Sequence, residues 1–265
     1  MDQKTLDGCI AKADRAEAQM QAFDFVWSMF RESNPYPSWV EVDAQTGWHH
    51  VWFDFSTPAP PSIPVIVGEF AHDLRSALDH LAWREALERI GAAEAEKLAG
   101  KITFPLAKES AEFDRAQTRA YVSKDAWTIM ERHQPYKRGR GKGPKSLGLL
   151  HWFSRMDKHR TVQIASVSLL PQFGMPPDYL ERRPRVPILD WNMLGPLPHR
   201  RLKGKTKVVS LRFDPAGPDP EVRVKGTPYL EVGFRDVPQP LWGIQLEESV
   251  QAVRAVIADF ADLLP

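Results

Sequence analysis

The sequence GEFAHDLRSALDHLAW, residues 68–83, repeats apolar and polar positions with the period of an α-helix. The apolar positions begin one residue earlier and form a single stripe along such a helix: Val67, Phe70, Leu74, Leu78 and Leu81. We predict a helix over residues 65–90, which Gly91 ends. At about 100° per residue, a second face opposite the stripe holds Glu69, His72, Ser76, Asp79, His80 and Trp83.

This second face differs from an ordinary solvent-exposed helix face, which is usually rich in Lys and Glu paired four residues apart. It carries two histidines, two acids, a serine and a tryptophan, and it lacks lysine. Such a composition is typical of a polar cleft or of a surface that contacts a partner.

Further periodic segments extend on both sides of this helix. Helical periodicity predicts four more helices, over residues 4–31, 110–132, 147–160 and 245–264. Alternating apolar residues predict a hairpin at residues 39–55 and short strands at 162–170, 207–213, 221–225 and 229–234. The fold class we expect is α+β and mainly α: a bundle of four to five long helices with a β-hairpin and a small Pro-rich β appendage.

These segments predict three parts of the chain. Residues 1–160 would form the helical bundle and include the hairpin at 39–55. Residues 161–240 would form the β-rich appendage. Residues 241–265 would supply a C-terminal helix that returns to the bundle.

The composition is that of a globular protein, because 43% of the 265 residues are hydrophobic and 26% are charged. Cys9 is the single cysteine, which excludes an intrachain disulfide and a Cys-rich zinc module. We find neither a signal-peptide core nor an apolar run near the roughly 18 residues of a membrane span. We therefore expect a cytoplasmic protein that is not inserted in a membrane.

The charges are distributed unevenly, although the formal net charge is only +1. Residues 137–207 carry 16 Lys or Arg against 4 Asp or Glu, and the rest of the chain is net acidic. Such asymmetry indicates a polyanionic partner. The candidate phosphate-binding residues are in the Gly-rich loop 137–145 and at the end of the predicted fourth helix: Lys137, Arg138, Arg140, Lys142, Lys145 and Arg160.

Arg75 and His80 form an Arg-x4-His motif on the helix of residues 65–90. In this motif the sequence resembles the HEPN superfamily, whose helical-bundle ribonucleases carry Arg-x4-6-His on a bundle helix. LRSALDHLAW, residues 74–83, together with DKHR, residues 157–160, also resembles a group of uncharacterised bacterial, especially actinobacterial, proteins. The first resemblance covers the motif and the helical character of residues 1–160, and the second implies no activity.

The HEPN resemblance implies a metal-independent ribonuclease or RNA-binding protein without a cofactor. His80 would act in proton transfer and Arg75 would stabilise phosphate charge. Asp79 and, from the neighbouring fourth helix, His159 complete the candidate catalytic set, because neighbouring bundle helices commonly build sites from facing side chains. These roles suit the chemistry, because RNA cleavage without a metal needs a base, an acid and a cation for the charge that develops on phosphorus. The family joins two motifs across a dimer, which implies a homodimer here.

Two alternatives remain open. In the first, Arg75 and Asp79 form an ion pair four residues apart, His80 is hydrogen-bonded in the bundle, and the two-sided helix is a non-catalytic interaction surface. In the second, Glu-x-x-His, formed by Glu69 and His72, belongs to a metal site of a helical-bundle enzyme. That site would also draw on His80 and on the fourth helix, through His151, Asp157 or His159.

Overall fold

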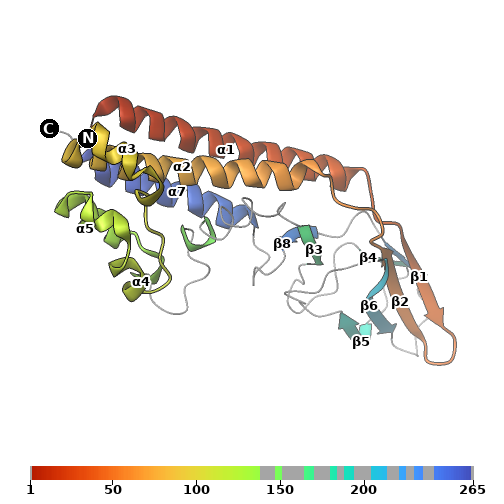
Figure 1. Cartoon of the computed structure of the whole chain (residues 1–265). Helices are drawn as coiled ribbons and strands as arrows, with labels where there is room; N and C mark the ends of the chain where they lie inside the picture. Colours follow the sequence, from red (N-terminus) through yellow and green to blue (C-terminus); the bar gives the residue numbers. More distant parts are fainter. Residues whose placement is uncertain are drawn as a thin grey trace. The chain divides into compact units, whose positions relative to one another are not determined.

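The computed structural model describes residues 2–137, 147–150, 164–169, 180–183, 188–193, 204–213, 221–224, 230–234 and 242–263 (Figure 1). The chain divides into two compact units. The first comprises residues 1–24, 64–162 and 243–265, and the second comprises residues 25–63 and 163–242. The fold class is α+β and mostly helical, with a four-stranded antiparallel sheet, in agreement with the class predicted.

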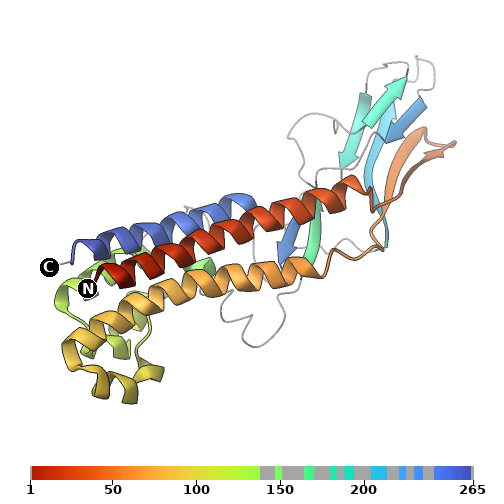
Figure 2. The same ribbon diagram turned by 90° about the horizontal axis from the view of Figure 1, so that it is seen from above.

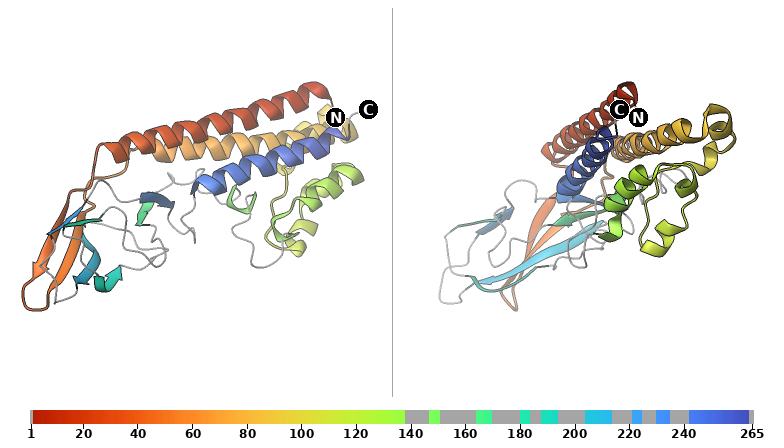
Figure 3. Two further views of the ribbon diagram at one scale, coloured as in Figure 1. Left: turned by 180° about the vertical axis from the view of Figure 1, so that it is seen from behind. Right: turned by 90° about the vertical axis from the view of Figure 1, so that its left-hand side faces the viewer.

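Three long helices lie mainly in the first unit. The parts of these helices that belong to this unit lie side by side in every view (Figures 2 and 3). They are α1 (Gln3–Glu32), α2 (Ser62–Ile90) and α7 (Trp242–Ala261). The first two run antiparallel, because Asp2 pairs with Arg84 near one end and Gln19 donates to Glu69 towards the other. All three were predicted from their periodicity, with ends that differ by a few residues.

The core of the first unit forms where apolar stripes meet. The stripe predicted on α2 is buried along its whole length, from Val67 to Leu81. Small residues of α1 face it and let the two helices approach closely, and Cys9 donates its thiol hydrogen to the carbonyl of Ala77 at 3.4 Å. Burial of α7 is equally continuous, through Val250, Val253, Val256, Ile257 and Phe260. These stripes explain why the helices are stable together.

The helix predicted over residues 110–132 is wrong. The structure has α4 (Ser110–Asp114), a 3-10 turn η2 (Gln117–Ala120) and α5 (Lys124–Arg132). Two short polar side chains explain the breaks. Thr118 is buried and hydrogen-bonds the backbone of residues 101 and 103, while Ser123 caps α5 by accepting from the N–H of Ala126.

Other short elements follow α2 and complete the described part of this unit. They are α3 (Ala92–Lys97), η1 (Ala99–Lys101) and η3 (Pro135–Lys137). Of the predicted fourth helix, residues 147–150 are helical and the remainder lies outside the described residues. A bundle of four to five long helices is therefore not confirmed, since only three of the helices described are long.

The second unit contains the four-stranded sheet, in the order β1-β2-β6-β5, and two further strand pairs. The strands of the sheet are β1 (Ser38–Asp43), β2 (Trp48–Asp54), β6 (Lys205–Phe213) and β5 (Ile188–Met193). The pairs are β3 (Ile164–Leu169) with β8 (Leu230–Phe234), and β4 (Leu180–Arg183) with β7 (Glu221–Val224). The hairpin was predicted, whereas β4 and β5 were not.

The hairpin belongs to the second unit and not to the helical bundle in which we expected it. The reason is the antiparallel pairing of β2 with β6, which joins residues 48–54 to residues 205–212. Helix α7 groups with the first unit, and Arg254 of α7 pairs with Asp14 and Glu17 of α1. Among the residues described, we find no helix with the length and hydropathy needed to cross a membrane.

Candidate functional site

Arg75 and Asp79 lie one turn apart on α2 and form a bidentate ion pair. The Nε and Nη2 atoms of Arg75 donate to the two carboxylate oxygens of Asp79 at 3.0 and 2.8 Å. Only 14% of the Arg75 side chain and 28% of the Asp79 side chain are exposed. The positive charge of Arg75 is thus neutralised by a neighbour on its own helix.

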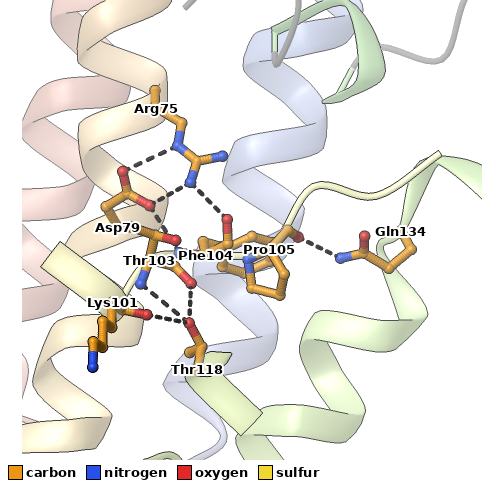
Figure 4. Close-up of polar contacts among 8 residues, drawn as sticks. All are labelled: Arg75, Asp79, Lys101, Thr103, Phe104, Pro105, Thr118 and Gln134. Atoms are coloured by element: carbon orange, nitrogen blue, oxygen red, sulfur yellow. Dashed lines mark hydrogen bonds and ion pairs between the residues drawn. The ribbon is translucent and has the colours of Figure 1, made fainter. Parts of the chain in front are cut away.

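The same pair holds the backbone of Phe104 (Figure 4). Nη2 of Arg75 donates to the Phe104 carbonyl at 2.7 Å, and Asp79 accepts the Phe104 N–H at 2.8 Å. Both backbone groups are satisfied although residues 102–107 belong to no helix or strand. We call Arg75, Asp79 and the backbone of Phe104 the α2 clamp.

Two further polar side chains secure the segment that the clamp holds (Figure 4). Thr118 accepts the Thr103 N–H at 3.1 Å and donates to its carbonyl at 2.6 Å. Gln134 is 1% exposed, donates to the carbonyls of Pro105 and Met130, and accepts the N–H of Ala107. The segment is therefore fixed from three directions, and Arg75 has a structural task that accounts for most of its hydrogen-bonding capacity.

Another line of side chains on α2 remains accessible. His72, Ser76 and His80 are spaced four residues apart, so they follow one line along the helix, and both histidines are exposed. Asp73, beside this line, forms an ion pair with Arg15 of α1 at 3.2 Å. We call the line of His72, Ser76 and His80, together with the neighbouring Lys12 and Arg15, the α1–α2 face.

His80 has the electrostatics of a proton acceptor. Partial loss of hydration and, next in size, the positive charge of Lys12 lower the pKa of its imidazole, and the carboxylate of Asp79 opposes them. A histidine with a lowered pKa is neutral at pH 7 and can accept a proton. The first alternative had His80 hydrogen-bonded in the bundle; the ring is instead exposed, and among the described residues no hydrogen bond to it is found.

The structure therefore separates the residues of the predicted catalytic set. Arg75 and Asp79 lie together in the clamp, as the first alternative expected, whereas His80 lies on the α1–α2 face. The fourth member, His159, lies outside the described residues. Sequence reasoning overlooked Lys12 and Arg15, although their spacing from Gln19 places all three near one side of α1.

The predicted phosphate-binding residues are described only in part. Lys137 donates to Glu131 at 2.6 Å and lies 5.6 Å from the centre of the Tyr136 ring, so its charge is already partnered. The others lie outside the described residues: Arg138, Arg140, Lys142, Lys145 and Arg160.

In the described part of the chain, the arrangement of side chains gives little support to the metal-site alternative. Searching those residues finds no group of three or more His, Cys, Asp or Glu side chains that could hold a metal ion. Glu69 accepts a hydrogen bond from Gln19 at 2.6 Å. The partners expected from the fourth helix, His151, Asp157 and His159, are outside the described residues.

Comparison of the chain with protein-family models, with curated proteins and with solved structures found no match.

Proposed function

We propose that this protein binds RNA at the α1–α2 face and cleaves it without a metal, with His80 in proton transfer. The observation that carries the proposal is the accessible imidazole of His80, whose pKa the charge of Lys12 helps to lower. Lys12 supplies positive charge on the same face, whereas Arg15 is paired with Asp73. The HEPN resemblance of the Arg-x4-His motif supports the same function.

The reaction would be an in-line displacement on phosphorus. His80 accepts the proton of a 2′-hydroxyl, whose oxygen forms a bond to phosphorus while the bond to the 5′-oxygen breaks. The products are a 2′,3′-cyclic phosphate and a 5′-hydroxyl, and an acid must protonate the leaving 5′-oxygen. His72 is about 12 Å along the helix from His80, too far to act on the same phosphate. A second copy of the chain, as the HEPN resemblance implies, would supply that acid.

Arg75 has a different role in this proposal from the one first expected. Its guanidinium is neutralised by Asp79 and holds the backbone of Phe104, so Arg75 positions the segment of residues 102–107 against α2. Lys12 is then the better candidate for stabilising phosphate charge, because no ion pair of Lys12 is found among the residues described and its charge acts directly on His80.

The test is cleavage of labelled single-stranded RNA in excess EDTA. Wild type should produce cyclic phosphate ends, and His80→Ala should lower the rate by about a hundredfold or more. Arg89→Ala is the control, because it removes an exposed charged side chain from the same helix outside the α1–α2 face, and it should retain activity. Equal rates for His80→Ala and wild type, or complete loss of cleavage in EDTA, would reject the proposal.

The second candidate function is a non-catalytic interaction protein that uses the same face of α2. The α2 clamp favours it, because the arginine of the motif is occupied by a structural task. The two functions differ in ligand: RNA binding requires affinity that falls steeply with salt, as counterions are released from phosphates. Full integrity of added RNA together with salt-insensitive association would favour the interaction protein.

A further inference from the structure

One face of the four-stranded sheet carries aromatic side chains at the surface. Along β2, burial alternates: His49, Val51 and Phe53 are buried, whereas Trp48 and Trp52 on the other face are only half-buried. A strand with period-two burial places its half-buried residues on one surface. This surface belongs to the second unit and has no part in the site proposed above.

Neighbouring strands enlarge the aromatic surface. Trp39 of β1 is the register partner of Trp52, and their rings are parallel within 4° at 6.2 Å between centroids. The two parallel indoles are stacked on each other across the strand pair and form one aromatic cluster at the surface of the sheet. The indole N–H of Trp39 donates to Glu41 at 3.0 Å, which helps to fix the orientation of this ring. We call Trp39, Trp48 and Trp52 the tryptophan platform.

Cations of β6 border the platform. Nζ of Lys205 lies 5.8 Å from the centre of the Trp39 ring, and the guanidinium of Arg212 lies 5.3 Å from that of Trp48. Lys207 is the register partner of Trp52. In the described part of the chain neither lysine forms an ion pair, whereas Arg212 is 3.9 Å from Asp190. Two lysine ammonium groups therefore remain available beside the rings.

Acidic residues of the same face are engaged within the hairpin. Asp43 accepts hydrogen bonds from Gln45 and Thr46 in the turn, and Asp54 accepts two from Ser56. The charge of the face is thus mixed and not strongly positive. A ligand that suits this face gains more binding free energy from contact with the aromatic rings than from ionic interactions. Such a ligand carries a few anionic groups that reach the lysines.

We propose that the tryptophan platform binds single-stranded RNA by stacking unpaired bases on Trp39 and Trp52, with phosphates beside Lys205 and Lys207. Stacking on aromatic side chains is a common way of holding unpaired bases, and it needs no hydrogen-bond readout. Duplex RNA does not fit, because its bases are stacked on one another. The choice of RNA as the ligand rests on the proposed function. Binding at the platform itself does not require His80.

The test is binding of a short fluorescein-labelled oligouridine to full-length protein carrying His80→Ala, so that cleavage does not interfere. Tryptophan fluorescence should be quenched, and Trp39→Ala or Trp52→Ala should each weaken binding about tenfold or more. Trp52→Phe keeps a ring and should retain most of the affinity. Val42→Ala is the matched control, because Val42 is exposed on the opposite face of β1.

Several outcomes would overturn the inference: equal affinity for the Trp→Ala variants and wild type, a preference for the annealed duplex, or binding of a neutral oligosaccharide in place of the oligouridine. A change of molecular mass in Trp52→Ala without any effect on oligouridine would instead make the face a contact between copies of the chain. Circular dichroism must first show that each variant is folded. If cleavage never depends on His80 but oligouridine binding depends on Trp39 and Trp52, the proposed catalysis fails and this inference stands.

Discussion

Arg75 donates a hydrogen bond to the backbone carbonyl of Phe104 at 2.7 Å, across 29 residues of sequence. A helix side chain thereby fixes a segment that has no secondary structure of its own. Because Asp79 accepts the N–H of the same residue, the ion pair on α2 substitutes for the neighbouring strand that such a backbone would otherwise need.

Substitution of Arg75 should destabilise the fold. Arg75→Ala leaves a partly buried carboxylate and a backbone carbonyl without their donor, which we expect to cost about 2–4 kcal/mol of unfolding free energy. Chemical denaturation measures it. Arg84→Ala is the control, since Arg84 also forms an i,i+4 pair on α2 but is more exposed, and it should cost about 1 kcal/mol or less. Similar losses for both variants would contradict the clamp.

Gln134 should matter as much as a core residue. Gln134→Leu keeps the approximate volume but leaves the Ala107 N–H and the Pro105 carbonyl unpaired in a buried place, at about 2–4 kcal/mol. The midpoint of urea unfolding reports the loss. Gln117→Leu, at an exposed position, should change stability by no more than about 0.5 kcal/mol. A neutral Gln134→Leu would mean that water replaces the amide.

Removal of the charge of Lys12 should raise the pKa of His80. The ammonium disfavours the imidazolium, so Lys12→Gln moves the titration of His80 to higher pH. If His80 is the base, the acidic limb of the pH–rate profile moves upward by the same amount. Proton NMR of the imidazole measures the first effect directly. Lys4→Gln, elsewhere on α1, should leave the titration unchanged, and an unshifted titration in Lys12→Gln would refute this assignment of cause.

Acid stability should depend on Asp259 of α7. Hydrogen bonds from His133 and then Arg132 lower the pKa of its carboxyl below the ordinary value. Because the folded form binds this proton less tightly than the unfolded form, the stabilisation is complete above about pH 4, the ordinary pKa of aspartate, and is lost as pH falls through the lowered pKa. Asp259→Asn should therefore lose stability above pH 4 and show a flatter dependence below it. Guanidinium unfolding at several pH values tests this, and parallel curves for both proteins would disprove it.

The sequence predicts those elements whose stabilising contacts are local. Helices α1, α2 and α7 have continuous apolar stripes, and the hairpin has alternation with a turn at Gly47, whose φ of 69° suits glycine. The segment 110–132 has helical periodicity too, but Thr118 forms hydrogen bonds with residues 101 and 103 instead. These hydrogen bonds join Thr118 to residues that lie 15 and 17 positions earlier in the chain. The helical periodicity of residues 110–132 carries no information about them.

The candidate site shows the same limit. The two-sided character of α2 follows from its sequence, and so does the possibility of an Arg75–Asp79 pair. That the pair binds the backbone of Phe104 does not follow from the sequence. The contact uses a backbone N–H and a carbonyl, and these groups leave no signal in the sequence. The parallel arrangement of the Trp39 and Trp52 rings could not be predicted from the sequence either, since it depends on the exact register of β1 against β2.

The interleaving of the two units along the chain has a consequence for how the protein is made on the ribosome. Residues of α7, which carry Val253 and Phe260 into the core of the first unit, are translated after the other two segments of that unit. Until then, the apolar stripes of α1 and α2 lack one of their covers. Nascent chains should thus expose apolar surface until α7 has been translated, which is the situation in which chaperones that bind extended apolar segments are engaged.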